Sequence, residues 1–471
     1  MRRYGAILMF VIVLVLPFAL RAMYSAPQPP PSSDALPLVI VTPNVEGIRR
    51  EFAEAFSRWH QKKYGQPVAI DYRNYGGTSA IVKFFEAQRS LYDKIGTYKI
   101  DLVWGGGDFL FETQLKGEGF LQGVDLGSDF MRDVFPQPTL AGLPLYDVGS
   151  PPQWFGAALS SFGICYNRDA LKYLGLPQPQ TWSDLADPRY RGWIVLADAT
   201  QSASAKTAYM VLVERAMVDA KLQGRGEDEG WARGMGLLRQ IAANARFFVD
   251  SGSSPSGIVG NGDVAASMVI DFYARSTIEQ LGEERMGYIE PANATAINPD
   301  PIALVKGAEH RETAIHFIRF VLSEEGQKLW ITKAGAAGGP TQTSLRRLPI
   351  RKSVYDHPEN FTDNVDPFVS ASQFNSSNSR KKTFEFLGDL MQYSMMDLLD
   401  DLRETRKEIL ASPRAAELDA KLGTFPFDQA EALRRAAEYH KASAVQRMAL
   451  QRQWTDEFRD EYRQLRKEAQ Q

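Results

Sequence analysis

The sequence predicts an α/β fold arranged in two lobes, and three observations support this prediction. Three short apolar runs between residues 38 and 108 alternate with helical and glycine-rich segments, which is typical of a parallel sheet covered by helices. An apolar run with paired serines, Trp154–Tyr166, then leads to a second set of such elements, and a proline-rich run after residue 290 leads back. A chain of 471 residues also exceeds the size of one ordinary domain.

The expected first lobe starts with the strand Leu38–Thr42, and the amphipathic helix Glu46–His60 follows it. The second strand, Val68–Tyr72, precedes Gly76–Ser79 and a helix, and the third, Ile100–Trp104, ends at three glycines. Ligands of open parallel sheets bind beyond the carboxyl ends of the strands, so we expect ligand-binding residues there. They are Thr42, Asn44, Gly77, Thr78, Ser79 and Gly106.

In the expected second lobe, the strand Trp193–Ala197 leads through Asp198–Ala205 into a helix. Thr200 and Ser202 place hydroxyl groups beside the start of this helix. Helix starts have unpaired N–H groups and a partial positive charge, so they bind anions, although Ser and Thr are also ordinary N-caps. We therefore expect Asp198, Thr200 and Ser202 to contact an anionic group of a ligand.

The segment Gly257–Ala308 carries the return to the first lobe. We expect a strand from Val264 to continue into Asp271, Phe272 and Tyr273. Asp271 and Tyr273 alternate with Phe272, so on a strand they share one face. Both are expected in the ligand site, and the alternative is that they only hold a loop in place.

Composition excludes several classes of function. The chain has 54 basic and 57 acidic residues, without the basic excess common in nucleic-acid binders, so we expect no nucleic-acid partner. The single cysteine, Cys165, excludes a disulfide framework and a cysteine-based zinc cluster. No two of the five histidines stand at metal-ligand spacing on one helix, and no nucleophile elbow or phosphate-binding loop is present. We therefore expect neither enzyme activity nor a resident cofactor.

Several segments together resemble a known family. They are Tyr166–Leu171, Pro179–Leu185, Asp187–Gly192 and Pro301–Ala308. In this order, within residues 37–350, they resemble the solute-binding proteins of ABC importers, in the branch that includes the ferric-ion binders. The resemblance implies the type II periplasmic-binding-protein fold, with two α/β lobes and two hinge crossings. It also implies a small-molecule or metal–anion ligand that is bound between the lobes and delivered to membrane permease subunits.

The resemblance leaves the ligand open. In the ferric relatives, adjacent tyrosines of this region hold the metal through phenolate oxygen. Here Phe272 replaces the first of them, and Asn44 stands where several relatives have a histidine. The resemblance therefore implies either ferric iron, held by Asp271 and Tyr273 as cargo, or an anion, alone or carrying a metal. A membrane-tethered ligand sensor or scaffold on the same fold is the alternative function, and an enzyme on this fold ranks last.

The two ends of the chain add further expectations. Basic residues before the apolar run Gly5–Leu20 are typical of an export signal, but Tyr24–Ala26 is a poor cleavage site. We expect a periplasmic or extracytoplasmic protein with either a cleaved signal peptide or an uncleaved anchor in the cytoplasmic membrane. At the other end, two long helices are expected over Thr383–Leu410 and Asp428–Glu468, packed on the protein itself or on another chain. The predicted boundaries are 1–26 for the signal peptide or anchor, 27–36 for a Pro-rich linker, 37–153 and 297–362 for the first lobe, 154–296 for the second lobe and 363–471 for a helical C-terminal extension.

Overall fold

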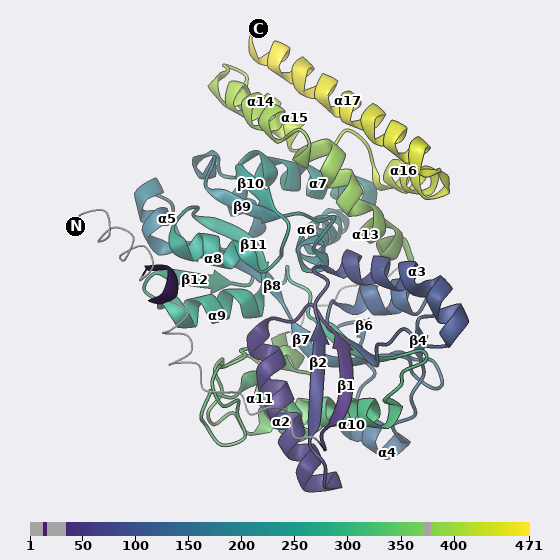
Figure 1. Ribbon diagram of the computed structural model, residues 1–471. Coiled ribbons are helices and arrows are strands. Elements are labelled where there is room, and N and C mark those ends of the chain that lie inside the picture. Colours follow the sequence, from purple (N-terminus) through teal and green to yellow (C-terminus); the bar gives the residue numbers. More distant parts are fainter. Residues whose placement is uncertain (1–12, 17–33, 371–377) are drawn as a thin grey trace, which may run out of the picture.

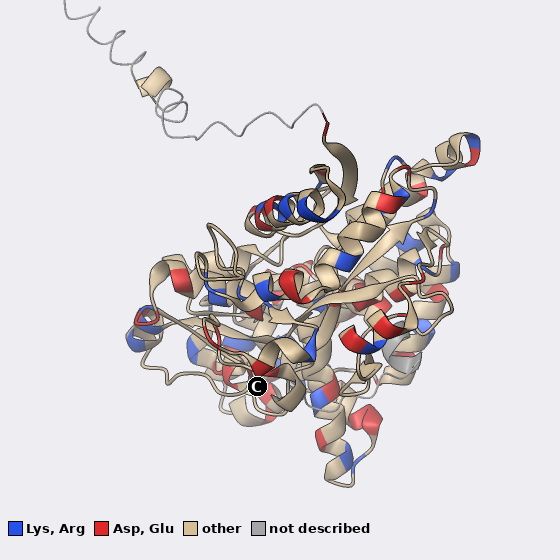
Figure 2. Ribbon diagram, turned by 90° about the horizontal axis from the view of Figure 1, so that it is seen from below, with Lys and Arg blue, Asp and Glu red and all other residues tan. Residues whose placement is uncertain are grey.

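The computed structural model describes residues 13–16, 34–370 and 378–471 (Figure 1). The predicted signal peptide or anchor, apart from residues 13–16, and most of the linker therefore lie outside the described residues. Within the described part of the chain, no helix is long and apolar enough to cross a membrane. Basic and acidic residues are mixed over the helices of the molecule in Figure 2, in keeping with their nearly equal totals.

The first lobe is built on a sheet in which β1 pairs in parallel with β2 and β3, as the βα repeats predict. The sheet continues from β3 to β13, which runs antiparallel to β3, β4 and β7. Its strands are β1 (Leu36–Val41), β2 (Val68–Arg73), β3 (Leu102–Trp104), β4 (Leu121–Gln122), β7 (Phe155–Ser160), β13 (Asn298–Val305) and β14 (Leu348–Pro349), and a separate hairpin joins β5 (Thr139–Leu140) to β6 (Leu143–Pro144). The helices of this lobe are α2 (Glu46–Tyr64), α3 (Thr78–Ile95), α4 (Ser128–Val134), α10 (Arg311–Leu322) and α11 (Glu324–Ile331).

Helix α2 shows why this sequence folds as predicted. Ile48, Phe52 and Phe56 recur every four residues, so they fall on one face of the helix and are buried. The Phe52 ring lies 4.4 Å from that of Trp330 in α11, and the Phe56 ring lies 5.0 Å from that of Phe317 in α10. These contacts join the first and last parts of the chain in one core.

The second lobe has its own five-stranded sheet, in the order β10-β9-β11-β8-β12. Strands β10, β9 and β11 are parallel to one another, while β8 runs antiparallel to β11 and β12. The strands are β8 (Phe162–Asn167), β9 (Ile194–Ala197), β10 (Ala245–Val249), β11 (Ala266–Ile270) and β12 (Met286–Ile289), and the helices are α5 (Arg168–Leu174), α6 (Ala203–Leu222), α7 (Glu227–Ala243), α8 (Ser254–Asn261) and α9 (Asp271–Leu281). The two-lobed α/β fold is thus confirmed.

The chain passes between the two sheets twice. It leaves the first sheet at Ser161, between β7 and β8, and returns through the segment 290–297, between β12 and β13. The predicted start of the second lobe at residue 154 is therefore too early, because β7 pairs with β13 and β14 of the first sheet. A single residue separates β7 from β8, so the apolar pattern shows one continuous run where the structure has two strands.

The expected strand through Tyr273 ends earlier than predicted. Strand β11 stops at Ile270, and Asp271 begins helix α9. The Asp271 carboxylate accepts a hydrogen bond from the N–H of Phe272 (2.8 Å), a favourable place for an acidic side chain because helix starts are positively polarised. Asp271 and Tyr273 are consequently about 200° apart around a helix rather than on one strand face.

Within the C-terminal extension, residues 378–471 form a helical layer against the second lobe (Figure 1), whereas Phe368 of the preceding segment packs on the core of the first lobe. The elements of the extension are α12 (Pro367–Ser370), α13 (Asn378–Met391), a π-helical turn (Gln392–Met396), α14 (Leu399–Ala411), α15 (Ala415–Leu422), α16 (Gln429–Lys441) and α17 (Ala444–Ala469). Each of the two long helices predicted here is divided. The second is interrupted before Ser443, which forms a capping box with Gln446 and starts α17, and Asp428 caps α16 as predicted.

A buried arginine fixes the extension to the second lobe. Arg239 of α7 is fully buried, donates to the Leu422 carbonyl (2.9 and 2.7 Å) and forms an ion pair with Glu461 of α17 (3.0 Å). Trp454 and Phe458 of α17 share one hydrophobic core with this lobe. The extension therefore packs on the protein's own body, which is one of the two alternatives that the sequence left open.

Candidate functional site

A cavity of about 500 Å³ lies between the lobes. The first lobe contributes the loops after β1, β2 and β3, and the second lobe contributes the loops that precede α6 and α8. The hinge crossings and one residue of the extension, Phe384, complete the lining. The cavity thus lies where the carboxyl ends of the parallel strands meet, as the sheet architecture requires.

Six of the predicted site residues line this cavity. They are Asn44, Gly77, Thr78, Gly106, Ser202 and Tyr273. Thr42, by contrast, is fully buried: its hydroxyl donates to the Trp104 carbonyl (2.6 Å) and accepts from the N–H of Asn44 (3.1 Å). Thr42 therefore ties the ends of β1 and β3 together and positions Asn44, and it does not line the cavity.

Ser79 and Thr200 join the lobes to each other. The Ser79 hydroxyl, in the first turn of α3, donates to the Thr200 carbonyl (2.9 Å) in the loop before α6. The Thr200 hydroxyl donates to the Asp198 carboxylate (2.6 Å), so the side chains of Thr200 and Asp198 stabilise a local turn. Ser79, Asp198 and Thr200 lie next to the cavity without lining it, and their predicted contact with a ligand is replaced by contacts within the protein.

Helix starts from both lobes line the cavity. Thr78 begins α3, and its N-cap, Gly77, has no side chain to satisfy the first N–H groups. Ser204 lies in the first turn of α6, and Ser253 precedes α8. Ser202 also caps α6, because its hydroxyl accepts from the N–H of Ala205 (3.3 Å). These positively polarised helix ends form an anion-binding environment without a basic side chain.

Three carboxylates also line the cavity. Asp108, Asp250 and Asp300 contribute to its lining, and no basic residue does so among the described residues that line the cavity. Asp108 accepts a hydrogen bond from the Asn298 side chain (3.2 Å). Ionised carboxylates only accept hydrogen bonds, so these side chains favour donors such as hydroxyl or amine groups.

The charge of Asp300 is compensated within the first lobe. It accepts from the N–H groups of Gly106 (2.6 Å) and Gly107 (2.9 Å), and Arg347 donates to its other oxygen (2.8 Å). Both glycines have positive φ, which explains why they follow β3. The sequence analysis did not identify Asp300 and Arg347. The three glycines after β3 were the available signal for a bound carboxylate, because the N–H groups of Gly106 and Gly107 donate to Asp300.

Tyr273 and Asp271 do not form the predicted metal-binding pair. Tyr273 lines the cavity, and burial raises the pKa of its phenol to about 12. Asp271 lies outside the lining, buried at the hinge, and burial raises the pKa of its carboxyl to about 7. In the described ranges, no group of three or more His, Cys, Asp and Glu residues is placed to hold a metal ion.

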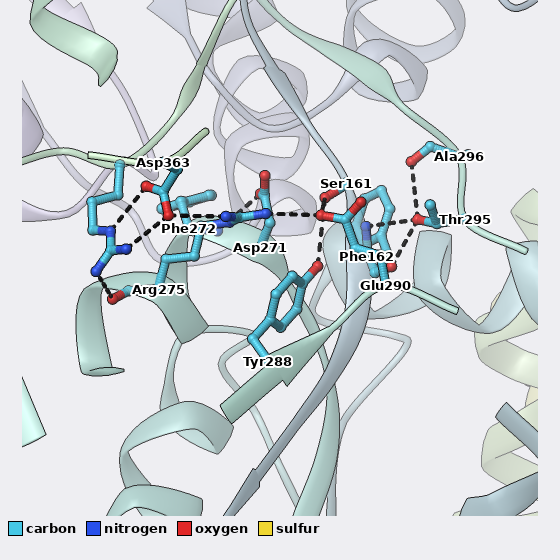
Figure 3. Close-up of polar contacts among 11 residues, drawn as sticks. Ser161, Phe162, Asp271, Phe272, Arg275, Tyr288, Glu290, Thr295, Ala296 and Asp363 are labelled. Atoms are coloured by element: carbon cyan, nitrogen blue, oxygen red, sulfur yellow. Dashed lines mark hydrogen bonds and ion pairs between the residues drawn. The ribbon is translucent and has the colours of Figure 1, made fainter. Parts of the chain in front are cut away.

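Asp271 belongs instead to the polar network at the hinge (Figure 3). Its backbone N–H donates to the Ser161 carbonyl (3.0 Å), and the Ser161 hydroxyl donates to Glu290 (2.6 Å). Arg275 of α9 pairs with both Glu290 (3.0 Å) and Asp363 (2.9 Å). This network ties the two crossings to α9 and to the start of the extension.

Comparisons with known proteins find several that are similar to this chain. It is similar to the phosphoglycerate transport regulatory protein PgtC of Salmonella typhimurium (29% identity over 174 residues, 36% of this chain) and spans only 39% of that relative's length. It is also similar to iron uptake protein A1 of Synechocystis (23% identity over 299 residues, 58% of this chain and 76% of the relative).

The solved structures share the fold. The periplasmic binding protein AfuA of Actinobacillus pleuropneumoniae, with fructose-6-phosphate bound, has a TM-score of 0.55 at 19% identity and covers 77% of this chain and 98% of its own. Iron-bound HitA of Pseudomonas aeruginosa has a TM-score of 0.52 at 18% identity, with 78% and 99% covered. A family model described as bacterial extracellular solute-binding protein matches residues 110–352, just over half of the chain. The chain therefore belongs to the family of bacterial extracellular solute-binding proteins.

Proposed function

We propose that this protein is the ligand-binding component of an ABC importer and that its ligand is a small organic anion with hydroxyl groups. The observation that carries the proposal is a cavity between the lobes that is lined by helix starts from both lobes and by carboxylates. Closure of the lobes buries the ligand, and the closed form is delivered to permease subunits. The protein catalyses no reaction, and a metal ion, where present, is cargo.

The helix starts are the proposed site of the anionic group. A phosphate or carboxylate near Thr78 and Ser204 accepts hydrogen bonds from first-turn N–H groups and hydroxyls of both lobes. The hydroxyl groups of the same ligand donate to Asp108 and lie near the aromatic rings of the lining. The names of two similar proteins agree with this class, since one refers to phosphoglycerate and the other is bound to fructose-6-phosphate.

Iron carried by an anion is the weaker variant of this proposal. Iron uptake protein A1 and iron-bound HitA are similar to this chain, and Tyr273 is one hard oxygen donor in the lining. The position of Asp271 outside the cavity weighs against a metal held mainly by the protein.

A sensing role is the second candidate, because the printed name of PgtC describes a regulatory protein. In this role the same cavity binds the ligand, and the extension on the second lobe contacts a signalling partner. Genes for a permease and an ATPase beside this one favour transport, whereas a neighbouring kinase gene favours sensing.

The family description supports a location outside the cytoplasm. We propose that the first 26 residues direct export and stay on part of the mature protein as an anchor. Mass spectrometry of the native protein tests this, because uniform cleavage near residue 26 with a soluble product contradicts the anchor.

Calorimetric titration tests the ligand class. We expect binding of 3-phosphoglycerate or fructose 6-phosphate, and weaker or no binding of spermidine and ferric citrate. A hydrogen bond to a charged group contributes about 1.5–3 kcal/mol, so Thr78→Val should weaken binding roughly ten- to a hundredfold without loss of fold stability. Tight binding of spermidine together with no binding of either phosphorylated compound refutes the proposed anion.

A further inference from the structure

A second compartment of about 150 Å³ adjoins the main cavity. Five residues line both spaces. They are Asp108, Phe109, Thr207, Asn298 and Phe384.

The second compartment is mainly apolar. Leu143, Pro144, Tyr146, Val148 and Trp154 line it in addition to the two shared phenylalanines. Val148 is 77% exposed, which is consistent with a place at an opening. An apolar group that enters this space leaves water and loses no hydrogen bond to these residues.

Two of the three carboxylates that line the second compartment, Glu112 and Asp147, are already paired. Lys116 binds Glu112 (3.0 Å) and Asp147 (2.7 Å). Trp154 donates its indole N–H to Glu112 (2.8 Å), and the backbone N–H of Gln153 donates to Asp147 (2.8 Å). Because Glu112 and Asp147 already have these partners, they do not require a charged group of a ligand to compensate them.

The C-terminal extension supplies part of the boundary between the two spaces. Phe384 of α13 lies 4.5 Å, ring to ring, from Phe109 of the first lobe. Because residue 384 lies beyond the segment matched by the family model, this contact is a feature of the chain's own extension.

We propose that the second compartment binds an apolar group of the ligand, a short alkyl chain or a single aromatic ring, and that Phe109 and Phe384 select for it. An apolar cavity of roughly 150 Å³ can hold benzene, so the second compartment limits the apolar group to about that size. The inference rests on the proposed function, because the anionic group at the helix starts places the apolar group beside these rings.

Calorimetry with inorganic phosphate and n-alkyl phosphates, from methyl to hexyl, tests the inference. Burial of one methylene contributes about 0.8 kcal/mol, so affinity should rise about fourfold per added carbon until the compartment is full. Thr113 lines only the second compartment, and Thr113→Phe should abolish this rise while methyl phosphate binds as before. Gln114→Phe, one position along and outside both linings, is the matched control and should keep the rise.

Phe384→Ala provides an independent test, because it should weaken hexyl phosphate more than methyl phosphate. If methyl phosphate binds and the affinity does not depend on chain length, the second compartment does not bind the alkyl group, whereas the anion site remains supported. A rise that persists in Thr113→Phe also overturns binding in the second compartment. Absence of binding for every phosphate, inorganic phosphate included, refutes the anion site and this inference together.

Discussion

Gly77→Ala is the sharpest test of how the lobes close. Gly77 has φ −73° and ψ 174°, a conformation that any residue adopts, so its backbone does not require glycine. A Cβ atom at this position, however, falls 2.3 Å from the carbonyl oxygen of Gln201 in the second lobe. The absence of a side chain is therefore required by the contact between the lobes.

The cost of the added methyl group follows from this geometry. A relaxed contact needs roughly 3.5 Å, so the lobes must separate here by about 1 Å. The hydrogen bond from Ser79 to the Thr200 carbonyl, now 2.9 Å, then exceeds the range in which such bonds form. Overpacking costs about 1–3 kcal/mol and the lost hydrogen bond about 1 kcal/mol. Together they predict binding weaker by at least tenfold, because only the closed form is affected.

Titration of 3-phosphoglycerate or fructose 6-phosphate into the variant measures this effect, and thermal unfolding without ligand checks the fold. Gly226→Ala is the matched control: Gly226 is the N-cap of α7 with φ −72° and ψ 150°, and no atom lies within 4 Å of an added Cβ. It should bind as the unmodified protein does. Unchanged affinity in Gly77→Ala, with an intact fold, shows that this contact is absent from the ligand-bound state and refutes the reasoning.

Three further predictions concern individual side chains. Ser202→Ala should lower the free energy of unfolding by about 1 kcal/mol, because Ser202 caps α6, whereas Thr78→Val should lower ligand affinity alone. Urea unfolding and calorimetry of both variants measure these two effects. A loss of affinity in Ser202→Ala together with a loss of stability in Thr78→Val contradicts the prediction. Burial raises the pKa of Asp271 from 3.8 to about 7, so the folded protein should lose stability as pH rises between these values. Asp271→Asn should flatten that loss, and unfolding curves at pH 4.5 and 8 check it; an unchanged slope contradicts it. Burial and the neighbouring His60 lower the pKa of His316 below its usual 6.5, so stability should fall as pH drops below 6.5. His316→Phe keeps an aromatic ring against Tyr64 and should reduce this loss of stability at low pH. Urea unfolding at pH 7.5 and 5.5 measures the loss. An equal loss in the variant and the unmodified protein contradicts the prediction.

The sequence by itself determined the local elements. The four-residue spacing of Phe52 and Phe56 predicts α2, and the alternating runs predict the parallel strands, because burial requires these periods. The order of short motifs between Tyr166 and Ala308 indicated the family, which the family model confirms. The positions of the strand ends also indicated where the cavity lies, since parallel strands present their carboxyl ends at one edge.

Only the tertiary structure decided which way each side chain points. Thr42 and Thr78 both follow strands, yet Thr42 bonds to β3 and Thr78 lines the cavity. Asp271 starts a helix because its carboxylate accepts a local N–H, although the residues before it form a strand. Phe384 reaches the cavity because its ring contacts Phe109, a residue 275 positions away in the chain. No local sequence pattern encodes a contact over that separation. Periodicity reports only which face of an element is buried, whereas a binding site depends on which other elements pack against that face.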